Sequence, residues 1–553
     1  MFELPERYNV TTLIDANLTA GRAAKTALLC DDEAVSYGEL LSRVCRMGRA
    51  LRRLGVRQGD RVVLILGDTP VFPVAFFGAL RIGAVPCPIN PLFREEDYAF
   101  FVRDAGAFVV VSDATYAAKV GRSLTGYPGN VSLIAPAGSA DDALSLEDLM
   151  SAEQDFLAPA DTHRDDMAFW LYSGGSTGLP KAVLHAHQDI PFTCESYARH
   201  VLGIRESDVC FARVLFHAYG LGGGLTFPIW AGATSILFPE RPTPAGIITV
   251  IERFRPSLLF LVPALYNAIL NEPTSACGDL SSLRLCISAA EPLAPEIWRR
   301  WHDHFGLEIL DGLGSTEMLH IFCSPVPGTV RPGSSGKPVP GYELRLVDDA
   351  GAVITKGDVG TLQVRGASAF SGYWRQRAKT LKTLIGEWVT TGDRYRVDRD
   401  GFYWYEGRTD DMIKIGGEWV SPIEIENVLH EHSAVREAAV VGVAVGGIMR
   451  IRAAVVLASG RTGSAVLTRE LQEWCKNHLQ RYQYPHLIDF VLELPKTITG
   501  KVQRFSGFAN GNWRPRSAVS RKRWPGMDIK NRIADLSGSN LLSAPAKLEG
   551  CGR

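Results

Sequence analysis

The chain has 553 residues, of which 46% are hydrophobic and 22% are charged, and its formal net charge is -1. This length exceeds what one hydrophobic core supports, so two or more domains are expected. The composition is typical of a globular protein, and the balanced charge gives no electrostatic case for binding nucleic acid or an anionic membrane.

The cysteine pattern and the N-terminal sequence indicate the cellular compartment of the protein. The ten cysteines are scattered and form no CxxC pair, so neither a zinc site nor a disulfide framework is indicated. The segment MFELPERYNV carries early acidic residues and no apolar stretch, so no secretory signal is visible. The longest apolar run, 438–449, is rich in glycine and shorter than the ~20 residues of a spanning helix. We therefore expect a cytoplasmic protein without membrane insertion.

Over the first 330 residues, short apolar runs alternate with segments of helical character. Strands are predicted within 61–68, 108–113, 131–136, 257–263 and 283–293, and a helix is predicted over 70–84. This alternation indicates parallel sheets in an α/β fold.

The pattern changes near residue 331. Segments 342–354, 360–366 and 394–408 contain short strands with Asp-Gly or Asp-Ala-Gly turns, which indicates an antiparallel or barrel-like β region. A helix and then a strand are predicted over 424–443. We expect a large N-terminal domain over 1–407 and a small α+β C-terminal domain over 408–505. The tail over 506–553 lacks periodicity and is predicted to be poorly ordered.

The segment LYSGGSTGLPKAVLH (171–185) combines glycines, hydroxyl side chains and a lysine. Glycine lets backbone N–H groups approach an anion, and lysine adds a positive charge, so the composition suits phosphate. It is not a Walker A loop, because Lys181 comes three residues after Gly178 and Ala182 follows it. Taken alone, the segment is best interpreted as a flexible surface turn.

Four further segments contain residue types suited to nucleotide chemistry. They are DGLGSTE (311–317), TTGD (390–393), GRTDDMIKIGGEWVSPIEIE (407–426) and LPKTITGKVQRF (494–505). Glu317 supplies the oxygen ligand that Mg²⁺ prefers, and Asp393 can accept hydrogen bonds from ribose hydroxyls. In this order, the five segments resemble the adenylate-forming superfamily over residues 8–505. That superfamily includes acyl-CoA synthetases, firefly luciferase and nonribosomal peptide adenylation domains.

The resemblance implies a role for each matching residue. Lys501 would be catalytic in adenylation, Glu317 would hold Mg²⁺ and Asp410 would be the hinge for rotation of the C-terminal domain. CoA would be contacted by Lys414, Gly416 and Gly417. ATP would be bound by Ser173, Gly174, Gly175, Ser176, Thr177, Gly178, Lys181, Ala289, Ala290, Glu291, Asp311, Gly312, Leu313, Thr316, Asp393 and Arg408.

Within the superfamily, segments 216–229, 311–322 and 331–348 are most similar to the benzoate-CoA ligase branch. This implies an ATP-dependent acid–thiol ligase that uses ATP, Mg²⁺ and CoA to convert benzoate or a substituted benzoate to aryl-CoA, AMP and pyrophosphate. His217 would be a catalytic gate between the acid and thiol channels, and His320 could donate a hydrogen bond to the acid. The acid pocket would be lined by Ala218, Tyr219, Gly312, Gly314 and His320.

Two alternatives stay open: an enzyme that loads an aryl group onto a carrier protein, and an inactive binding protein that retains the fold. Three departures from the family pattern stand out. Ala182 and Ala290 occupy positions where glycine is usual, and about fifty unrelated residues follow Phe505. A frame change near the end of the gene would produce such a tail, and sequencing that end tests this hypothesis. The oligomeric state is not predicted.

Overall fold

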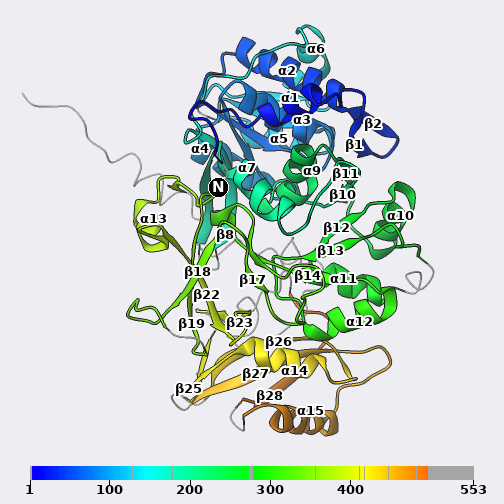
Figure 1. Ribbon diagram of the computed structural model, residues 1–553, viewed down its shortest axis with the longest axis vertical. Helices are drawn as coiled ribbons and strands as arrows, with labels where there is room; N and C mark the ends of the chain where they lie inside the picture. Colours follow the sequence, from blue (N-terminus) through cyan, green and yellow to red (C-terminus); the bar gives the residue numbers. More distant parts are fainter. Residues whose placement is uncertain are drawn as a thin grey trace, which may run out of the picture.

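The computed structural model describes residues 3–127, 129–175, 178–272, 278–354, 357–409, 412–415, 418–445, 448–480 and 483–495. The fold is mixed α/β, with a large N-terminal region and a small C-terminal α+β region (Figure 1). Within the described ranges, no helix is long and apolar enough to cross a membrane. The eight cysteines of those ranges are buried and form no disulfide with one another.

A five-stranded parallel sheet in the order β4-β3-β5-β6-β7 forms the first part of the N-terminal region. Its middle strands are buried on both faces, which explains their continuous runs of valine, leucine and isoleucine. The strands are β3 (Arg61–Ile65), β4 (Val85–Pro88), β5 (Val109–Ser112), β6 (Ser132–Ala135) and β7 (Leu144–Ser145). The helices of this part are α2 (Tyr37–Arg53), α3 (Val71–Arg81), α4 (Glu95–Ala105), α5 (Ala114–Leu124) and α6 (Leu146–Ser151).

A seven-stranded sheet in the order β14-β13-β12-β10-β11-β1-β2 forms the second part, and all its pairings are parallel except β1 with β2. Its strands are β1 (Thr26–Cys30), β2 (Glu33–Ser36), β10 (Val209–Phe211), β11 (Thr234–Leu237), β12 (Leu258–Leu261), β13 (Leu285–Ser288) and β14 (Ile309–Asp311). The accompanying helices are α1 (Thr12–Thr19), α7 (Asp189–Thr193), α8 (Ala218–Leu221), α9 (Phe227–Ala231), α10 (Pro244–Phe254), α11 (Pro263–Leu270) and α12 (Pro295–Phe305). Two π-helical turns, η1 (Cys194–Arg199) and η2 (Gly222–Thr226), extend α7 and join α8 to α9.

Antiparallel strands follow, as the Asp-Gly turns predict. The largest sheet has the order β18-β19-β22-β21, with β23 paired to β22. These strands are β18 (Glu343–Val347), β19 (Gly360–Arg365), β21 (Leu384–Ile385), β22 (Trp388–Val397) and β23 (Tyr403–Arg408). One smaller sheet contains β8 (Met167–Gly175), β9 (Gly178–Ala186) and β20 (Gly372–Tyr373). Another contains β15 (Leu313–Gly314), β16 (Ile321–Ser324) and β17 (Lys337–Pro338). The helix α13 (Arg377–Thr383) and the 3₁₀ turn η4 (Thr316–Met318) lie nearby in the chain.

The C-terminal region has a hydrophobic core of its own, which includes Ile413, Val440 and Leu471. Figure 1 shows it below the rest of the molecule in yellow and orange. It contains the hairpin β24 (Ile413–Ile415) and β25 (Glu418–Val420), then α14 (Pro422–His430), β26 (Val435–Val445), β27 (Ile448–Leu457), α15 (Ala465–His478) and β28 (Leu487–Val491). The domain boundary at residue 408 stays a prediction.

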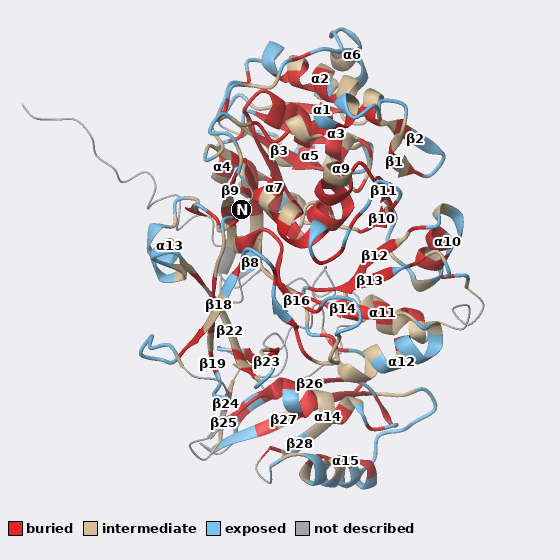
Figure 2. Ribbon diagram, viewed as in Figure 1, coloured by how far each residue is buried: buried red, intermediate tan, exposed pale blue. Residues whose placement is uncertain are grey.

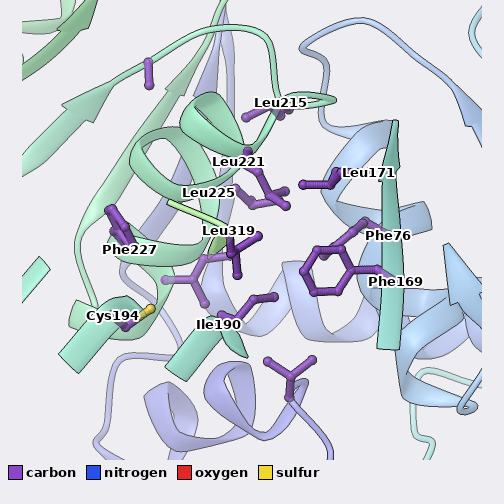
Figure 3. Packing of buried hydrophobic residues seen from close by; sticks show 14 of the residues in the cluster. Phe76, Phe169, Leu171, Ile190, Cys194, Leu215, Leu221, Leu225, Phe227 and Leu319 are labelled. Carbon is purple, nitrogen blue, oxygen red and sulfur yellow. The ribbon is translucent and has the colours of Figure 1, made fainter. Parts of the chain in front are cut away.

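A continuous core joins the two parts of the N-terminal region, and Figure 2 shows its buried strands and helices in red. Phe76 of α3 packs edge-on against Phe169 of β8 with ring centroids 5.6 Å apart. In Figure 3, Leu171 of β8 faces Leu221 and Leu225. Strand β8 therefore carries the core from the first sheet to the helical turns that follow β10, where the predicted acid pocket begins.

Candidate active site

The described ends of the predicted phosphate loop lie on β8 and β9, which pair in antiparallel fashion. Ser173 pairs with Lys181, and Gly175 pairs with Gly178. The glycines and serines indicated only a flexible turn, but regular strands extend to both sides of it. Lys181 therefore leaves a strand that is fixed in the core, and the position of its ammonium group is set by that strand.

Lys181, Glu317 and Tyr373 meet beside this hairpin. The Tyr373 hydroxyl donates a 2.8 Å hydrogen bond to Oε1 of Glu317, and Nζ of Lys181 lies 3.7 Å from the same oxygen. The Lys181 ammonium also lies 4.3 Å from the centre of the Tyr373 ring. Burial lowers the pKa of Lys181, and the charge of Glu317 opposes this shift. The structure thus brings together the predicted phosphate lysine and the predicted Mg²⁺ carboxylate.

His185 connects strand β9 to the turn that carries Glu317. Its Nε2 lies 2.8 Å from the carbonyl oxygen of Thr316, and its Nδ1 lies 2.8 Å from Oδ2 of Asp189. A carbonyl oxygen only accepts hydrogen bonds, so Nε2 carries a proton. Burial raises the pKa of Asp189. The His185 ring therefore fixes the Thr316 backbone next to the proposed metal ligand.

The predicted ribose-binding pair lies on adjacent strands. Asp393 of β22 is directly opposite Arg408 of β23, and Nη1 of Arg408 donates a 3.0 Å hydrogen bond to Oδ1 of Asp393. Gly392 has a φ of +75°, and a Cβ there would lie 3.1 Å from the Arg408 guanidinium. Glycine thus allows the backbone to turn beneath the arginine.

The predicted adenine-binding residues follow the carboxyl ends of the parallel strands β13 and β14. Ser288 is opposite Asp311, and the Gly312 N–H donates to the Ser288 carbonyl oxygen at 2.8 Å. Asp311 accepts a hydrogen bond from the Leu293 N–H, and burial raises its pKa from 3.8 to about 7. Ligands of open α/β sheets bind at this end of parallel strands, so the position suits a nucleotide base.

Ala290, at the position where the family usually has glycine, has a φ of +74°. This left-handed conformation is strained for alanine, and the strain explains the usual preference for glycine. Ala289 is buried, and Glu291 is half-buried. Leu313, also half-buried, lies on β15 opposite Cys323 of β16.

The predicted acid pocket begins at α8, where Ala218 is buried and Tyr219 is half-buried. The Tyr219 hydroxyl donates to the carbonyl oxygen of Ile287 at 2.9 Å and lies 3.3 Å from that of Leu261. This anchors the ring to strands β12 and β13. Tyr219 can therefore offer a rigid aromatic face to a ligand while its hydroxyl is occupied by backbone.

His320 is 2% exposed and lies among aromatic rings, with its ring centre 4.5 Å from that of Phe227. Burial lowers the pKa of His320 to about 3, so the ring is neutral. Nε2 lies 3.3 Å from the Tyr219 carbonyl oxygen and is thus the protonated nitrogen. Nδ1 is then a hydrogen-bond acceptor, and it has no partner among the described residues. The sequence led us to expect a donor, whereas this geometry favours an acceptor.

The glycines around the predicted acid pocket allow neighbouring protein groups to pack against the backbone, and they do not open space for a ligand. A Cβ on Gly222 would lie 2.2 Å from Cδ2 of His320, and one on Gly223 would lie 2.6 Å from the Phe260 ring. A Cβ on Gly312 or Gly314 would collide with residues 320–321. Because these missing side chains face protein, direct contact of Gly312 and Gly314 with the acid stays a prediction.

His217 occupies the position before the first residue of α8, and it lies close enough to His320 that its charge would lower the pKa of His320. Its N–H donates to the Val214 carbonyl oxygen at 2.9 Å. This places the predicted gate at the edge of the predicted acid pocket.

Several predicted residues lie outside the described residues: Ser176, Thr177, Asp410, Gly416, Gly417 and Lys501. Lys414 lies on β24 of the C-terminal region, paired with Trp419 of β25. Sequence reasoning missed Tyr373 and His185, which are 192 and 131 residues away from their partners Lys181 and Thr316. The only signals were an aromatic residue in SGYW and a histidine two residues before another histidine.

The nucleotide-binding features and the small C-terminal region both match known family models. Residues 16–374 match the AMP-binding enzyme family, and residues 424–501 match the AMP-binding enzyme C-terminal domain. The chain belongs to the AMP-binding enzyme family. The expected resemblance to adenylate-forming enzymes is therefore confirmed.

Relatives within the AMP-binding enzyme family include aryl-CoA ligases. The chain is 46% identical to a benzoate–CoA ligase of Thauera aromatica over 508 residues, which is 91% of this chain and 96% of that protein. A benzoate CoA ligase structure from Burkholderia xenovorans LB400 is 44% identical with a TM-score of 0.84, and covers 90% of this chain and 99% of its own. The structure of the anthranilate CoA ligase AuaEII in complex with anthranoyl-AMP is 39% identical with a TM-score of 0.87. The match covers 91% of this chain and 97% of AuaEII.

Proposed function

We propose that this protein is an ATP-dependent aryl-CoA ligase that joins benzoate or a ring-substituted benzoate to CoA and releases AMP and pyrophosphate. The observation that carries the proposal is the 46% identity to a benzoate–CoA ligase across 91% of the chain. The two catalysed steps would be formation of an acyl-adenylate and its conversion to a thioester.

The site offers suitable chemistry for the first step. A carboxylate is a poor acyl donor, and attack of its oxygen on the α-phosphorus converts it to a mixed anhydride while pyrophosphate leaves. Both reactants are anionic, so positive charge is needed where they meet. We assign the contact with the pyrophosphate to Lys181 and the contact with the carboxylate and α-phosphate to Lys501.

Glu317 fits the role of Mg²⁺ ligand. Mg²⁺ commonly binds one or two carboxylates together with substrate phosphates, and Glu317 presents one carboxylate beside the phosphate hairpin. Bound Mg²⁺ would supply opposing charge for the phosphates. Tyr373 and Lys181 hold the Glu317 carboxylate at this position.

In the second step the CoA sulfur attacks the activated carbonyl, the thiol proton is lost, and AMP leaves. Lys501 and the segment with Lys414, Gly416 and Gly417 both belong to the C-terminal region. We therefore propose that rotation about Asp410 replaces Lys501 with this segment between the steps. His217 would border both the acid and the thiol at this stage.

The residues of the predicted acid pocket support the proposed substrate class. The Tyr219 ring and the rings around His320 provide an apolar, aromatic lining suited to a flat ring. Nδ1 of His320 would accept a hydrogen bond from an amino or hydroxyl substituent. We therefore propose that donor-substituted benzoates are accepted alongside benzoate.

ATP–pyrophosphate exchange tests the proposal. Exchange that depends on benzoate is expected from the proposed enzyme and would not occur with an inactive binding protein. AMP release that depends on free CoA then separates CoA ligation from carrier-protein loading. Exchange without CoA-dependent AMP release would support the carrier-loading alternative and overturn the proposal.

A further inference from the structure

A buried carboxylate from the first sheet holds the chain immediately before the predicted gate. Asp68 follows β3 and is 6% exposed. Its Oδ2 accepts the Val214 N–H at 2.7 Å, and its Oδ1 accepts the Leu215 N–H at 2.9 Å. The two oxygens thus bind two consecutive backbone donors that lie 146 and 147 residues further along the chain.

The backbone held by Asp68 is strained. Val214 has a φ of +67°, in the left-handed region. This region is disfavoured for residues with a Cβ, and a β-branched residue there is a genuine outlier. Such a conformation persists only where its surroundings determine it, and strained backbone often occurs at ligand sites. The two hydrogen bonds that Asp68 accepts come directly from the strained residue and its neighbour.

Two further contacts fix the same turn. The Leu215 side chain is fully buried, and Figure 3 shows it beside the helical turn that carries Leu221. On the other side, a Cβ on Gly220 would lie 2.0 Å from the Arg213 carbonyl oxygen and 2.4 Å from that of Val214. Helix α8 therefore rests directly on the strained backbone, and only glycine permits this approach.

The turn ends at the residues assigned to the acid pocket. The Val214 carbonyl oxygen accepts the His217 N–H at 2.9 Å, and the His217 carbonyl oxygen accepts the Leu221 N–H at 2.8 Å. Ala218 and Tyr219 begin the helix that follows. Hydrogen bonds therefore connect Asp68 through Val214 to His217.

The loop that carries Asp68 is itself held in place. The Gly67 N–H donates a 2.8 Å hydrogen bond to Oδ2 of Asp113, at the start of α5. Arg213 lies near Asp68, but its guanidinium donates to the Glu240 carbonyl oxygen. The loop that carries Asp68 thus orients its carboxylate toward the backbone of Val214 and Leu215.

We propose that Asp68 is a positioning residue that sets the specificity for the acid, by holding Val214 in its strained conformation and thereby fixing His217 and α8 against the acid pocket. This rests on the proposed aryl-CoA ligase function. The phosphate hairpin and the Asp393–Arg408 pair lie on other elements, so we expect recognition of ATP to be independent of Asp68.

The test is Asp68→Asn, which keeps the shape of the side chain but turns an amide N–H₂ toward one of the two backbone donors. We expect the KM for benzoate in ATP–pyrophosphate exchange to rise at least tenfold, while the KM for ATP stays within twofold. We also expect the preference for benzoate over a bulkier ring-substituted acid, measured as a ratio of kcat/KM values, to fall at least threefold.

Asp348→Asn is the matched control. Asp348 accepts two backbone N–H groups, from Ala350 and Ala352, in the turn after β18, and it has no assigned role in the site. We expect no change in either KM for this variant. An equal effect of Asp68→Asn and Asp348→Asn on the benzoate KM would overturn the proposal, as would an unchanged benzoate KM in Asp68→Asn.

A rescue variant separates positioning from general stability. Val214→Gly removes the strain that Asp68 opposes, so the double variant Asp68→Asn/Val214→Gly should regain a benzoate KM within threefold of the parent. If Asp68→Asn alone does not fold, the double variant is measured in its place, and failure of that variant to fold or to bind benzoate refutes the proposal. Inactivity of the parent with every aryl acid would instead refute the proposed function, so the two failures are distinguishable.

Discussion

Replacement of Gly222 by alanine tests how the acid pocket is built. The new Cβ would lie 2.2 Å from Cδ2 of His320, 2.5 Å from its Nε2 and 3.0 Å from the Phe227 ring. Carbon atoms in contact lie about 3.5–4.0 Å apart, so the His320 ring must move by more than about 1 Å. It cannot move without losing the hydrogen bond to the Tyr219 carbonyl oxygen or disturbing the rings around it.

The magnitude follows from the cost of overpacking. Extra carbon in a packed site costs about 1–3 kcal/mol. If this cost falls on the bound complex, the KM for benzoate rises roughly 5- to 150-fold, since about 1.4 kcal/mol is a factor of ten. The KM for ATP should stay within about twofold. Steady-state ATP–pyrophosphate exchange measures both constants.

Gly121→Ala is the matched control for Gly222→Ala. Gly121 lies within α5, and a Cβ there would be 3.7 Å from Leu133, which is ordinary contact. We expect this variant to be about 0.5–1 kcal/mol more stable, with unchanged kinetics. A benzoate KM in Gly222→Ala that equals that of the control, or an equal rise in both KM values, would refute the reasoning.

Three further outcomes are expected. Folding raises the pKa of Asp311 from 3.8 to about 7, so the stability that its protonated form provides is complete below about pH 4 and is lost as the pH rises through 7. Asp311→Asn mimics the neutral acid. Between pH 5 and pH 8 its free energy of unfolding should therefore rise by up to about 3 kcal/mol relative to that of the parent, as measured by denaturant titration. Parallel plots of the free energy of unfolding against pH for the two proteins would contradict this. Ala290→Gly should raise the free energy of unfolding by up to about 1 kcal/mol, because φ is +74° there, and no gain would argue against strain. Lys501→Ala should slow adenylation by ~10²-fold or more while thioester formation from supplied benzoyl-adenylate largely survives, and equal losses in both would contradict its assigned role.

The sheets of the N-terminal region could be predicted because their strands are buried on both faces. Runs such as 62–65 and 109–111 are continuously apolar, and the structure places both in parallel strands. The antiparallel region after residue 331 followed from its Asp-Gly turns. The β8–β9 hairpin was missed, because its glycine- and serine-rich end looks like a flexible loop in sequence.

The individual site residues were predicted by resemblance, but the contacts that hold them were not. Asp68 and Val214 are 146 residues apart, and Tyr373 and Glu317 are 56 apart. No local periodicity links such pairs, because they meet only when two sheets pack together. The protonation of His320 also depends on its fold, since its Nε2 is committed to a carbonyl oxygen of another segment.

The most direct test of the proposed function is product formation with a panel of carboxylic acids. The purified chain is incubated with ATP, Mg²⁺, CoA and one acid at a time, and acyl-CoA is detected by mass. We expect benzoyl-CoA and AMP in equal amounts, with weaker products from ring-substituted benzoates and little from linear fatty acids. Absence of an acyl-CoA product with every aryl acid would contradict the proposed function.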